Sequence, residues 1–189
     1  MKQPKAWLPF GPELLLERMV RIVGEVVQPV VVVAARGQKL PRLGANVTIV
    51  RDRRTDCGPM EGVAAGLAAL SITCDAAFVA SCDLPLLRAE LVRFVCGSLR
   101  EHDDAIVPRI GGFPQPLAAI FRTKLAPQLD ARIARGEMSL RDFFMTISTH
   151  WLDEQSLRAV DPELQSLLNV NTPAEYATAL KTLKFGNDV

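Results

Sequence analysis

Asp83 is a carboxylate at the point where a strand-like run of small and apolar residues, 76–81, comes to an end. Such a run is typical of a strand that is buried on both faces, as in a parallel sheet. Ligands of open α/β sheets bind beyond the carboxyl ends of the strands, and a carboxylate there can hold Mg2+ together with substrate phosphates. The alternative is that Asp83 only caps a helix expected to begin near Arg88, and the local pattern alone favours the cap.

A second carboxylate, Asp52, follows the strand-like segment Val47–Val50 in the same way. Two carboxylates at the ends of two strands can converge on one cleft. Asp52 also lies in the arginine-rich stretch 51–54, so the pattern alone favours a solvated salt bridge over a binding role.

Three further segments carry groups that could bind phosphate. Residues 57–62 read Cys-Gly-Pro-Met-Glu-Gly, a turn that opens a helix whose free backbone N–H groups can hold an anion. Asn169 and Asn171 would point the same way in an extended segment, and their amides suit phosphate, sugar or metal-bound water, although Asn171 could equally be a turn residue. Lys5 precedes an apolar loop and could reach phosphates. The pattern alone favours the alternative, a lysine near the N-terminus that has no binding role.

Strand patterns and helix patterns alternate along the chain. The expected strands are Val30–Ala35, Val47–Val50, Asp75–Ser81, Ala105–Val107, Leu117–Phe121 and His150–Leu152. The expected helices are Glu13–Val27, Pro59–Leu70, Arg88–Leu99, Lys124–Arg135, Ser139–Met145 and Thr172–Leu183. This alternation predicts βαβ crossovers and a mainly parallel α/β sheet. No repeat or linker interrupts it, so residues 1–189 are expected to form one domain.

The composition argues against several classes of protein. A net charge of +1 leaves no electrostatic footprint for nucleic acid. The apolar runs are short, so we expect neither a membrane span nor a signal peptide. The four cysteines form no Cys-x-x-Cys pair, which fits a protein of the reducing cytoplasm. Two histidines are too few for a His-rich metal site, and no Gly-x-Ser-x-Gly elbow suggests a nucleophilic triad.

Eight short motifs follow one another along the chain. They are Lys5–Gly11 (Lys-Ala-Trp-Leu-Pro-Phe-Gly), Val31–Val33, Val50–Asp52, Gly58–Gly62, Cys82–Pro85, Gln115–Leu117, Gly136–Arg141 and Asn169–Pro173. Each motif alone is weak, but the ordered set covers nearly the whole chain. In this order the motifs resemble those of the molybdenum cofactor guanylyltransferase family.

The resemblance implies a Rossmann-like, three-layer α/β/α nucleotidyltransferase fold. It also implies the transfer of GMP from GTP to the phosphate of molybdopterin, with release of pyrophosphate and with Mg2+ as cofactor. Phosphoryl-type transfer needs positioning and charge neutralisation and no protein nucleophile, so the lack of a triad is no objection. The implied partners are GTP, molybdopterin and, transiently, other proteins of cofactor biosynthesis.

The resemblance also gives roles to individual residues. Asp83 would hold Mg2+ and act in catalysis. The residues that would line the catalytic cleft with it are Asn169 and Asn171. The residues that would bind the nucleotide are Lys5, Asp52, Gly58, Pro59 and Gly62, with Lys5 on the phosphates and Asp52 on the guanine nucleotide.

Two departures from the family pattern change these expectations. The segment Val33–Arg36 lacks the amide that the family usually carries there, and no strand with a glycine-rich phosphate loop precedes Lys5. We expect Met1 to be an internal methionine of a longer reading frame, and we expect weak or absent turnover from the 189-residue chain. Loss of a central strand would leave unpaired ladder groups and an open slot in the sheet. A stop codon directly upstream of Met1 would contradict the expectation of a longer frame.

Two alternatives stand beside this function, and the second of them is not an enzyme. One is a related nucleotidyltransferase with another substrate, such as CTP with molybdopterin or a sugar phosphate. The other is a degenerate homologue without activity that acts as a binding subunit, in which the sheet slot could accept a partner strand. Thermal-shift measurements with GTP and CTP discriminate these alternatives, because only a bound nucleotide raises the apparent stability.

Overall fold

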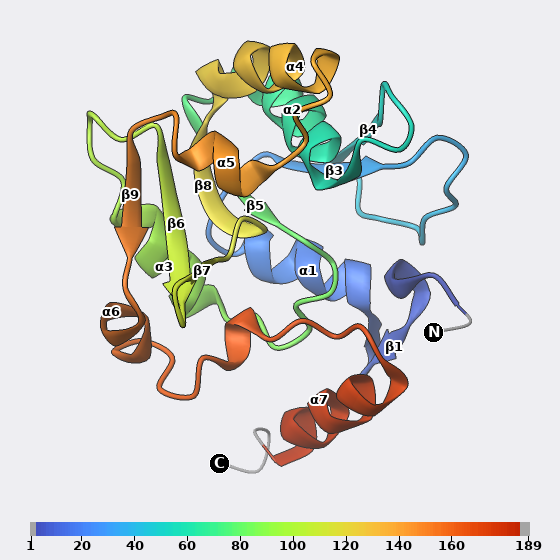
Figure 1. The fold of residues 1–189 in the computed structure, drawn as a ribbon. Coiled ribbons are helices and arrows are strands. Elements are labelled where there is room, and N and C mark those ends of the chain that lie inside the picture. The colour runs from blue at the N-terminus through green and yellow to red at the C-terminus, as the bar shows by residue number, and fades with distance from the viewer. Residues whose placement is uncertain (1–2, 186–189) are drawn as a thin grey trace.

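The computed structural model describes residues 3–185 (Figure 1). Its α-helices are α1 Leu15–Gly24, α2 Gly58–Leu70, α3 Ala89–Gly97, α4 Ala126–Ala134, α5 Leu140–Phe144, α6 Glu154–Arg158 and α7 Pro173–Phe185. Its strands are β1 Pro9–Phe10, β2 Glu13–Leu14, β3 Val30–Ala34, β4 Val47–Arg51, β5 Ala76–Ala80, β6 Ala105–Ile110, β7 Phe113–Pro114, β8 Ala118–Arg122 and β9 Thr149–Leu152. Short 3-10 turns are η1 Lys5–Trp7, η2 Thr123–Leu125 and η3 Gln165–Leu167.

Alternate residues of the central strands enter two separate hydrophobic cores. Ala105 and Val107 of β6 pack in a core with residues of α2, α4 and α5, whereas Ile106 packs in a core with residues of α1 and α3. Phe121 and Ile120 of β8 divide between the two cores in the same way. This follows from the two-residue period of a strand. The helices therefore cover both faces of the sheet, with α2 and α4 on one side and α1 on the other (Figure 1).

The larger sheet contains one reversed strand. β8 runs antiparallel to both β5 and β6, and β9 runs parallel to β6, so β5, β6 and β9 share one direction. The short β7 pairs with the end of β6. The expected α/β nucleotidyltransferase-like fold is confirmed. The reversed direction of β8 departs from the expected, mainly parallel arrangement. Its cause is the Gly111-Gly112 turn after β6, which returns the chain without a crossover helix.

Strands β3 and β4 form a parallel pair of their own, with Val32 opposite Ile49. Within residues 3–185 no ladder joins β3 to β5, so the strands lie in separate sheets. The sequence predicted that the strand before Asp83 is buried on both faces. This prediction is wrong, because every residue of β5 is only half-buried. One edge of β5 pairs with β8, and among the strands of residues 3–185 none pairs with the other edge.

The first helix begins later than its apolar pattern predicted. Gly11, with φ +68°, turns the chain so that Pro9–Phe10 pairs with Glu13–Leu14 before α1 begins at Leu15. The Leu14 N–H donates to Glu17 Oε2 over 2.9 Å, which satisfies one free donor at the start of the helix. Among the described helices, none has both the length and the apolar character needed to cross a bilayer.

Candidate active site

Lys5, Asp83 and Asn171 meet beyond the carboxyl end of β5. The Lys5 ammonium donates to Asp83 Oδ2 over 2.9 Å and to Asn171 Oδ1 over 2.7 Å. The side chains of Lys5 and Asp83 are 30% and 22% exposed, so this ion pair is only partly screened by solvent. The alternative role as a helix cap is excluded, because α3 begins at Ala89 and its cap residue, Arg88, makes no side-chain cap.

The segment that carries Asn171 is fixed by backbone hydrogen bonds. The Val170 N–H donates to the Asp83 carbonyl oxygen over 2.9 Å, which ties the two loops together. Glu175 Oε2 accepts from the N–H groups of Asn171 and Thr172, and the Thr172 hydroxyl accepts from the Glu175 N–H. These backbone hydrogen bonds hold the pKa of Glu175 below its usual value. This reciprocal capping at the start of α7 sets the position of Asn171.

Ser81 is a member of the cluster that sequence reasoning missed. Its hydroxyl donates to Asp83 Oδ1, so both carboxylate oxygens of Asp83 have a partner. A strand pattern could not indicate this contact, because β5 ends at Ala80 and residues 82–83 form a turn. Asn169, in contrast, is exposed, and within the described part of the chain its side chain makes no hydrogen bond to the cluster.

Asp52 lies in a second group, at the carboxyl end of β4. The favoured salt bridge with its arginine neighbours is wrong, since Arg53 and Arg54 pair with Glu61 and Asp130. Among residues 3–185 the Asp52 carboxylate takes part in no ion pair. Burial, and to a smaller extent the charge of Glu61, raise the pKa of Asp52 above its usual value. An unpaired acid of this kind at a strand end is a candidate for ligand binding.

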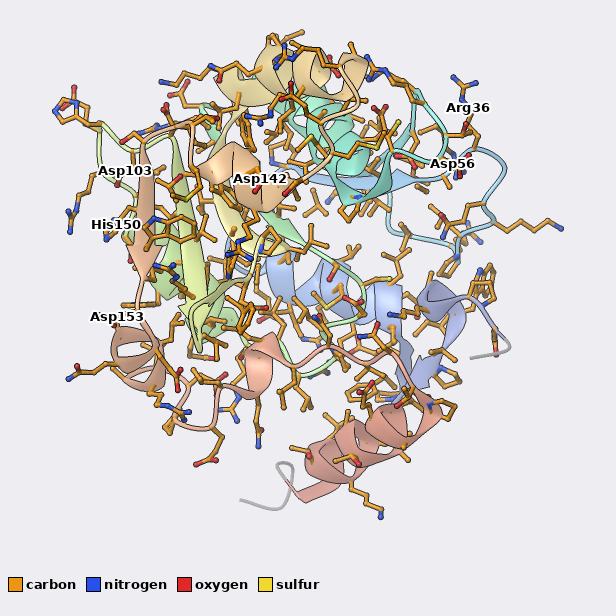
Figure 2. All side chains as sticks on the ribbon, in the orientation of Figure 1. Arg36, Asp56, Asp103, Asp142, His150 and Asp153 are labelled. Carbon is orange, nitrogen blue, oxygen red and sulfur yellow. The ribbon has the colours of Figure 1, made fainter. Side chains whose placement is uncertain are left out.

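A cavity of about 380 Å³, lined mostly by residues with polar or charged side chains and called the polar cavity below, lies beside Asp52. Arg36, which follows β3, reaches across this loop and donates through Nε to the Asp52 carbonyl oxygen over 3.1 Å. Gly58 lines the same cavity with φ +62°, a left-handed conformation that favours glycine. Figure 2 shows Arg36 and Asp56, which also line the cavity, on the same side of the molecule. Pro59 and Gly62 line a different cavity, between α2 and strands β3 and β5.

Glu61 holds the loop that carries Asp52. Its carboxylate is 1% exposed and accepts from the Arg53 N–H over 2.8 Å and from Arg54 Nη1 over 2.8 Å. Burial alone would raise its pKa, but the hydrogen bond from Arg54 and the one from the Arg53 backbone lower the pKa of Glu61 below its usual value. The first turn of α2 thus organises the loop through one buried acid.

Replacing Asp52 by asparagine is expected to stabilise the fold by about 0.5–1 kcal/mol at pH 7. The amide carries no charge, so the costs of burial and of repulsion by Glu61 disappear. Because the folded-state pKa of Asp52 is raised, this gain is present at pH 7 and vanishes as the pH falls through that pKa. Urea unfolding at pH 7 and at pH 3 measures this gain and its loss. A less stable variant at pH 7 contradicts the environment described for Asp52.

Asp83 suits a magnesium ion as a single carboxylate ligand. Magnesium keeps several waters and takes one or two carboxylates together with substrate phosphates. Both Asp83 oxygens face polar partners that can move, the Lys5 ammonium and the Ser81 hydroxyl. Within the described chain no group of three acidic, histidine or cysteine side chains gathers into a metal cage. The residues present therefore fit a metal ion that is bound by one carboxylate of the protein and by the phosphates of a substrate.

The histidines lie away from both groups. His150 Nδ1 is 3.5 Å from the Asp103 carboxylate, and Figure 2 shows this pair near β9, on the opposite side of the molecule from Arg36 and Asp56. Within residues 3–185, no hydrogen bond or ion pair joins a histidine to either group.

Relatives of this chain have been found by sequence and by structure. Residues 1–152 match the family described as MobA-like NTP transferase domain. A probable molybdenum cofactor guanylyltransferase of Mycobacterium marinum is 36% identical, over 92% of this chain and 83% of the relative. A molybdenum cofactor guanylyltransferase of Desulfosudis oleivorans is 28% identical, over 96% of this chain and 88% of the relative.

Among solved structures, molybdopterin-guanine dinucleotide biosynthesis protein A of Archaeoglobus fulgidus superposes with a TM-score of 0.79 at 20% identity. The superposition covers 97% of this chain and 92% of that protein, and at this identity it shows a shared fold. The family match over most of the chain and the 36% identical relative agree with it. The chain therefore belongs to the MobA-like NTP transferase family.

Proposed function

We propose that this protein transfers the GMP group of GTP to the phosphate of molybdopterin. In this reaction a phosphate oxygen of molybdopterin forms a bond to the α-phosphorus of GTP, and the bond from that phosphorus to the bridging oxygen of pyrophosphate breaks. The electron pair of the broken bond leaves with pyrophosphate. The names of the 36% and 28% identical relatives support this reaction and this nucleotide.

The contact of Lys5 with Asp83 and Asn171 is the observation that carries the proposal. A cation, a carboxylate and an amide within hydrogen-bond distance beyond a strand end can neutralise and orient a triphosphate. Lys5 donates to Asp83, and its ammonium would turn onto a phosphate oxygen when a triphosphate binds. The hydrogen bonds from the Ser81 hydroxyl and the Val170 N–H would keep Asp83 in place while the Lys5 ammonium moves to the phosphate.

Magnesium is proposed as the metal that Asp83 holds. The ion would supply charge neutralisation to the triphosphate, and Asn169 and Asn171 would line the cleft around it. Asp52 and Gly58, with Arg36 beside them, are proposed to bind the nucleotide in the polar cavity at the end of β4. Pro59 and Gly62 remain proposals for nucleotide binding with weaker support, because they line the separate cavity between α2 and strands β3 and β5.

A thermal shift in the presence of Mg2+ tests the nucleotide preference. At about 100 times its Kd, GTP is expected to add about 2.7 kcal/mol, which raises the Tm by roughly 5–10 °C for a chain of this size. CTP at the same concentration is the matched control and is expected to give no comparable shift. An equal shift with CTP would point to a related nucleotidyltransferase. No shift with either nucleotide would refute the proposal and favour a binding subunit without activity.

A further inference from the structure

The loop that begins at Asp83 and the segment that ends at Asn171 are joined at two points. At the first point, the Val170 N–H donates to the Asp83 carbonyl oxygen over 2.9 Å. At the second point, the Arg88 N–H donates to the Ser166 hydroxyl oxygen over 3.2 Å. The earlier residue of one segment is bonded to the later residue of the other, so the two segments run antiparallel. We call these two hydrogen bonds the clamp.

Ser166 binds the start of α3 from a distant part of the chain. Arg88 is the residue that precedes α3, and its own side chain provides no cap for the helix. Backbone N–H groups at the start of a helix need acceptors from outside the helix, and the Ser166 hydroxyl is such an acceptor for Arg88. Ser166 is 0% exposed, so bulk water cannot compete for its hydroxyl. The second point of the clamp is therefore made by a buried side chain.

Asp161 fixes the position of Ser166. Asp161 is 1% exposed, and its Oδ2 accepts from the Ser166 N–H over 2.7 Å. Its carbonyl oxygen accepts from the Leu164 N–H over 2.9 Å. Leu164 has φ +53°, a left-handed conformation that is uncommon for a residue other than glycine. The carboxylate and the carbonyl of Asp161 thus close one tight turn, and this turn presents the Ser166 hydroxyl to Arg88.

The Asp161 carboxylate is kept at a cost in stability. Its Oδ1 is buried and accepts no hydrogen bond from the described residues. A buried polar atom without a partner destabilises a fold, and the neighbouring residues Leu157 and Leu164 belong to a hydrophobic core. Side chains that break a packing rule in this way are expected where function requires a fixed geometry. The geometry that Asp161 fixes is that of the clamp.

We propose that Asp161 and Ser166 are positioning residues of the candidate active site. Through the clamp they fix the Asp83 carboxylate relative to the Asn171 amide. One hydrogen bond alone would let one segment turn about the other, whereas two points of attachment prevent that rotation. Within residues 3–185, neither of them makes a hydrogen bond to the side chain of Lys5, Asp83 or Asn171. They therefore act through the backbone. Only the consequence for the metal rests on the proposed function, in which Asp83 holds Mg2+.

Hydrogen exchange of the Val170 amide tests this inference in the intact chain without nucleotide. Ser166→Ala removes the hydroxyl and adds no atom, so the chain is expected to fold. Without the second point of the clamp the two segments separate more often, and the Val170 amide is expected to exchange at least about 10-fold faster, while amides in the middle of β6 are unchanged. The matched control is Ser98→Ala at the other end of α3, where the hydroxyl donates to the Phe94 carbonyl oxygen over 2.8 Å. This control is expected to leave the exchange of Val170 unchanged.

Variants of Asp161 and a titration with Mg2+ add a readout that a general loss of stability does not move. Asp161→Ala leaves the Ser166 N–H without an acceptor, whereas Asp161→Asn keeps an oxygen for it. Asp161→Ala and Ser166→Ala are expected to weaken the Mg2+-dependent part of GTP binding roughly 10-fold, as measured by calorimetric titration with and without Mg2+. Asp161→Asn is expected to bind as the unchanged chain does.

The two measurements separate this inference from the proposed function. Faster Val170 exchange in Ser166→Ala and Asp161→Ala, and not in Asp161→Asn, supports the inference. Unchanged exchange in both alanine variants, or an equal loss of protection in Asp161→Asn, overturns it. Faster exchange with undiminished Mg2+-dependent binding overturns the positioning role. If the unchanged chain binds no GTP, the proposed function fails, while the exchange of Val170 still decides whether Asp161 and Ser166 hold the clamp.

Discussion

The variant Asp83→Asn is expected to lose the part of GTP binding that depends on Mg2+. Removing groups that only support a metal ligand already costs roughly 10–100-fold in affinity, so loss of the proposed ligand itself should weaken Mg2+-dependent binding by about 100-fold or more. Asparagine keeps an oxygen that can accept from Lys5 or Ser81, so the local fold is expected to survive. Calorimetric titration of GTP with and without Mg2+ measures the difference.

A matched variant separates this effect from a general loss of negative charge. Asp142, in α5, is exposed, and within residues 3–185 no hydrogen bond or ion pair joins its carboxylate to the Lys5–Asp83–Asn171 contacts. Asp142→Asn is expected to bind GTP as the unchanged chain does, with the same dependence on Mg2+. If Asp83→Asn also retains that dependence, Asp83 is not the metal ligand.

The variant Glu61→Gln is expected to lower the free energy of unfolding by about 2 kcal/mol, which corresponds to roughly 4–8 °C in Tm. The amide loses the charge that binds Arg54 and weakens the acceptor for the Arg53 N–H. Because the folded-state pKa of Glu61 is lowered, its contribution is present above its usual pKa of 4.5 and is lost as the pH falls through the folded-state value. Thermal unfolding at pH 7 and at pH 3 measures the difference at each pH.

Glu90 provides the control for this variant. Its ion pair with Arg93 is exposed on both sides, at 3.6 Å. Glu90→Gln is expected to change the stability by less than about 0.5 kcal/mol. A Glu61→Gln variant as stable as Glu90→Gln would contradict the role of Glu61 in holding the Asp52 loop.

The position of Asp83 could be predicted from the sequence because it depends on local features. An apolar run that stops at a carboxylate and a proline marks a strand end, and alternation of strands and helices places that end at the ligand edge of an α/β sheet. Ser139 and Thr172 were readable as helix caps for the same reason, and both accept the expected backbone hydrogen bonds. Each of these features lies within a few residues of chain.

The partners of Arg53 and Arg54 could not be predicted, because they depend on tertiary packing. Asp130 lies in α4, 76 residues after Arg54, and Glu61 is buried by the packing of α2 against that helix. Proximity in sequence suggested Asp52 as the partner, and the fold gave the arginines two other acids.

A crystal structure with GTP and Mn2+, in which anomalous scattering locates the metal, tests the central claim most directly. Mn2+ replaces Mg2+ for its signal and accepts the same oxygen ligands. The metal is expected within about 2.0–2.2 Å of an Asp83 carboxylate oxygen, with the Lys5 ammonium turned onto a phosphate oxygen and the guanine beside Asp52. A metal bound without Asp83, or a triphosphate placed away from Lys5, would contradict the account.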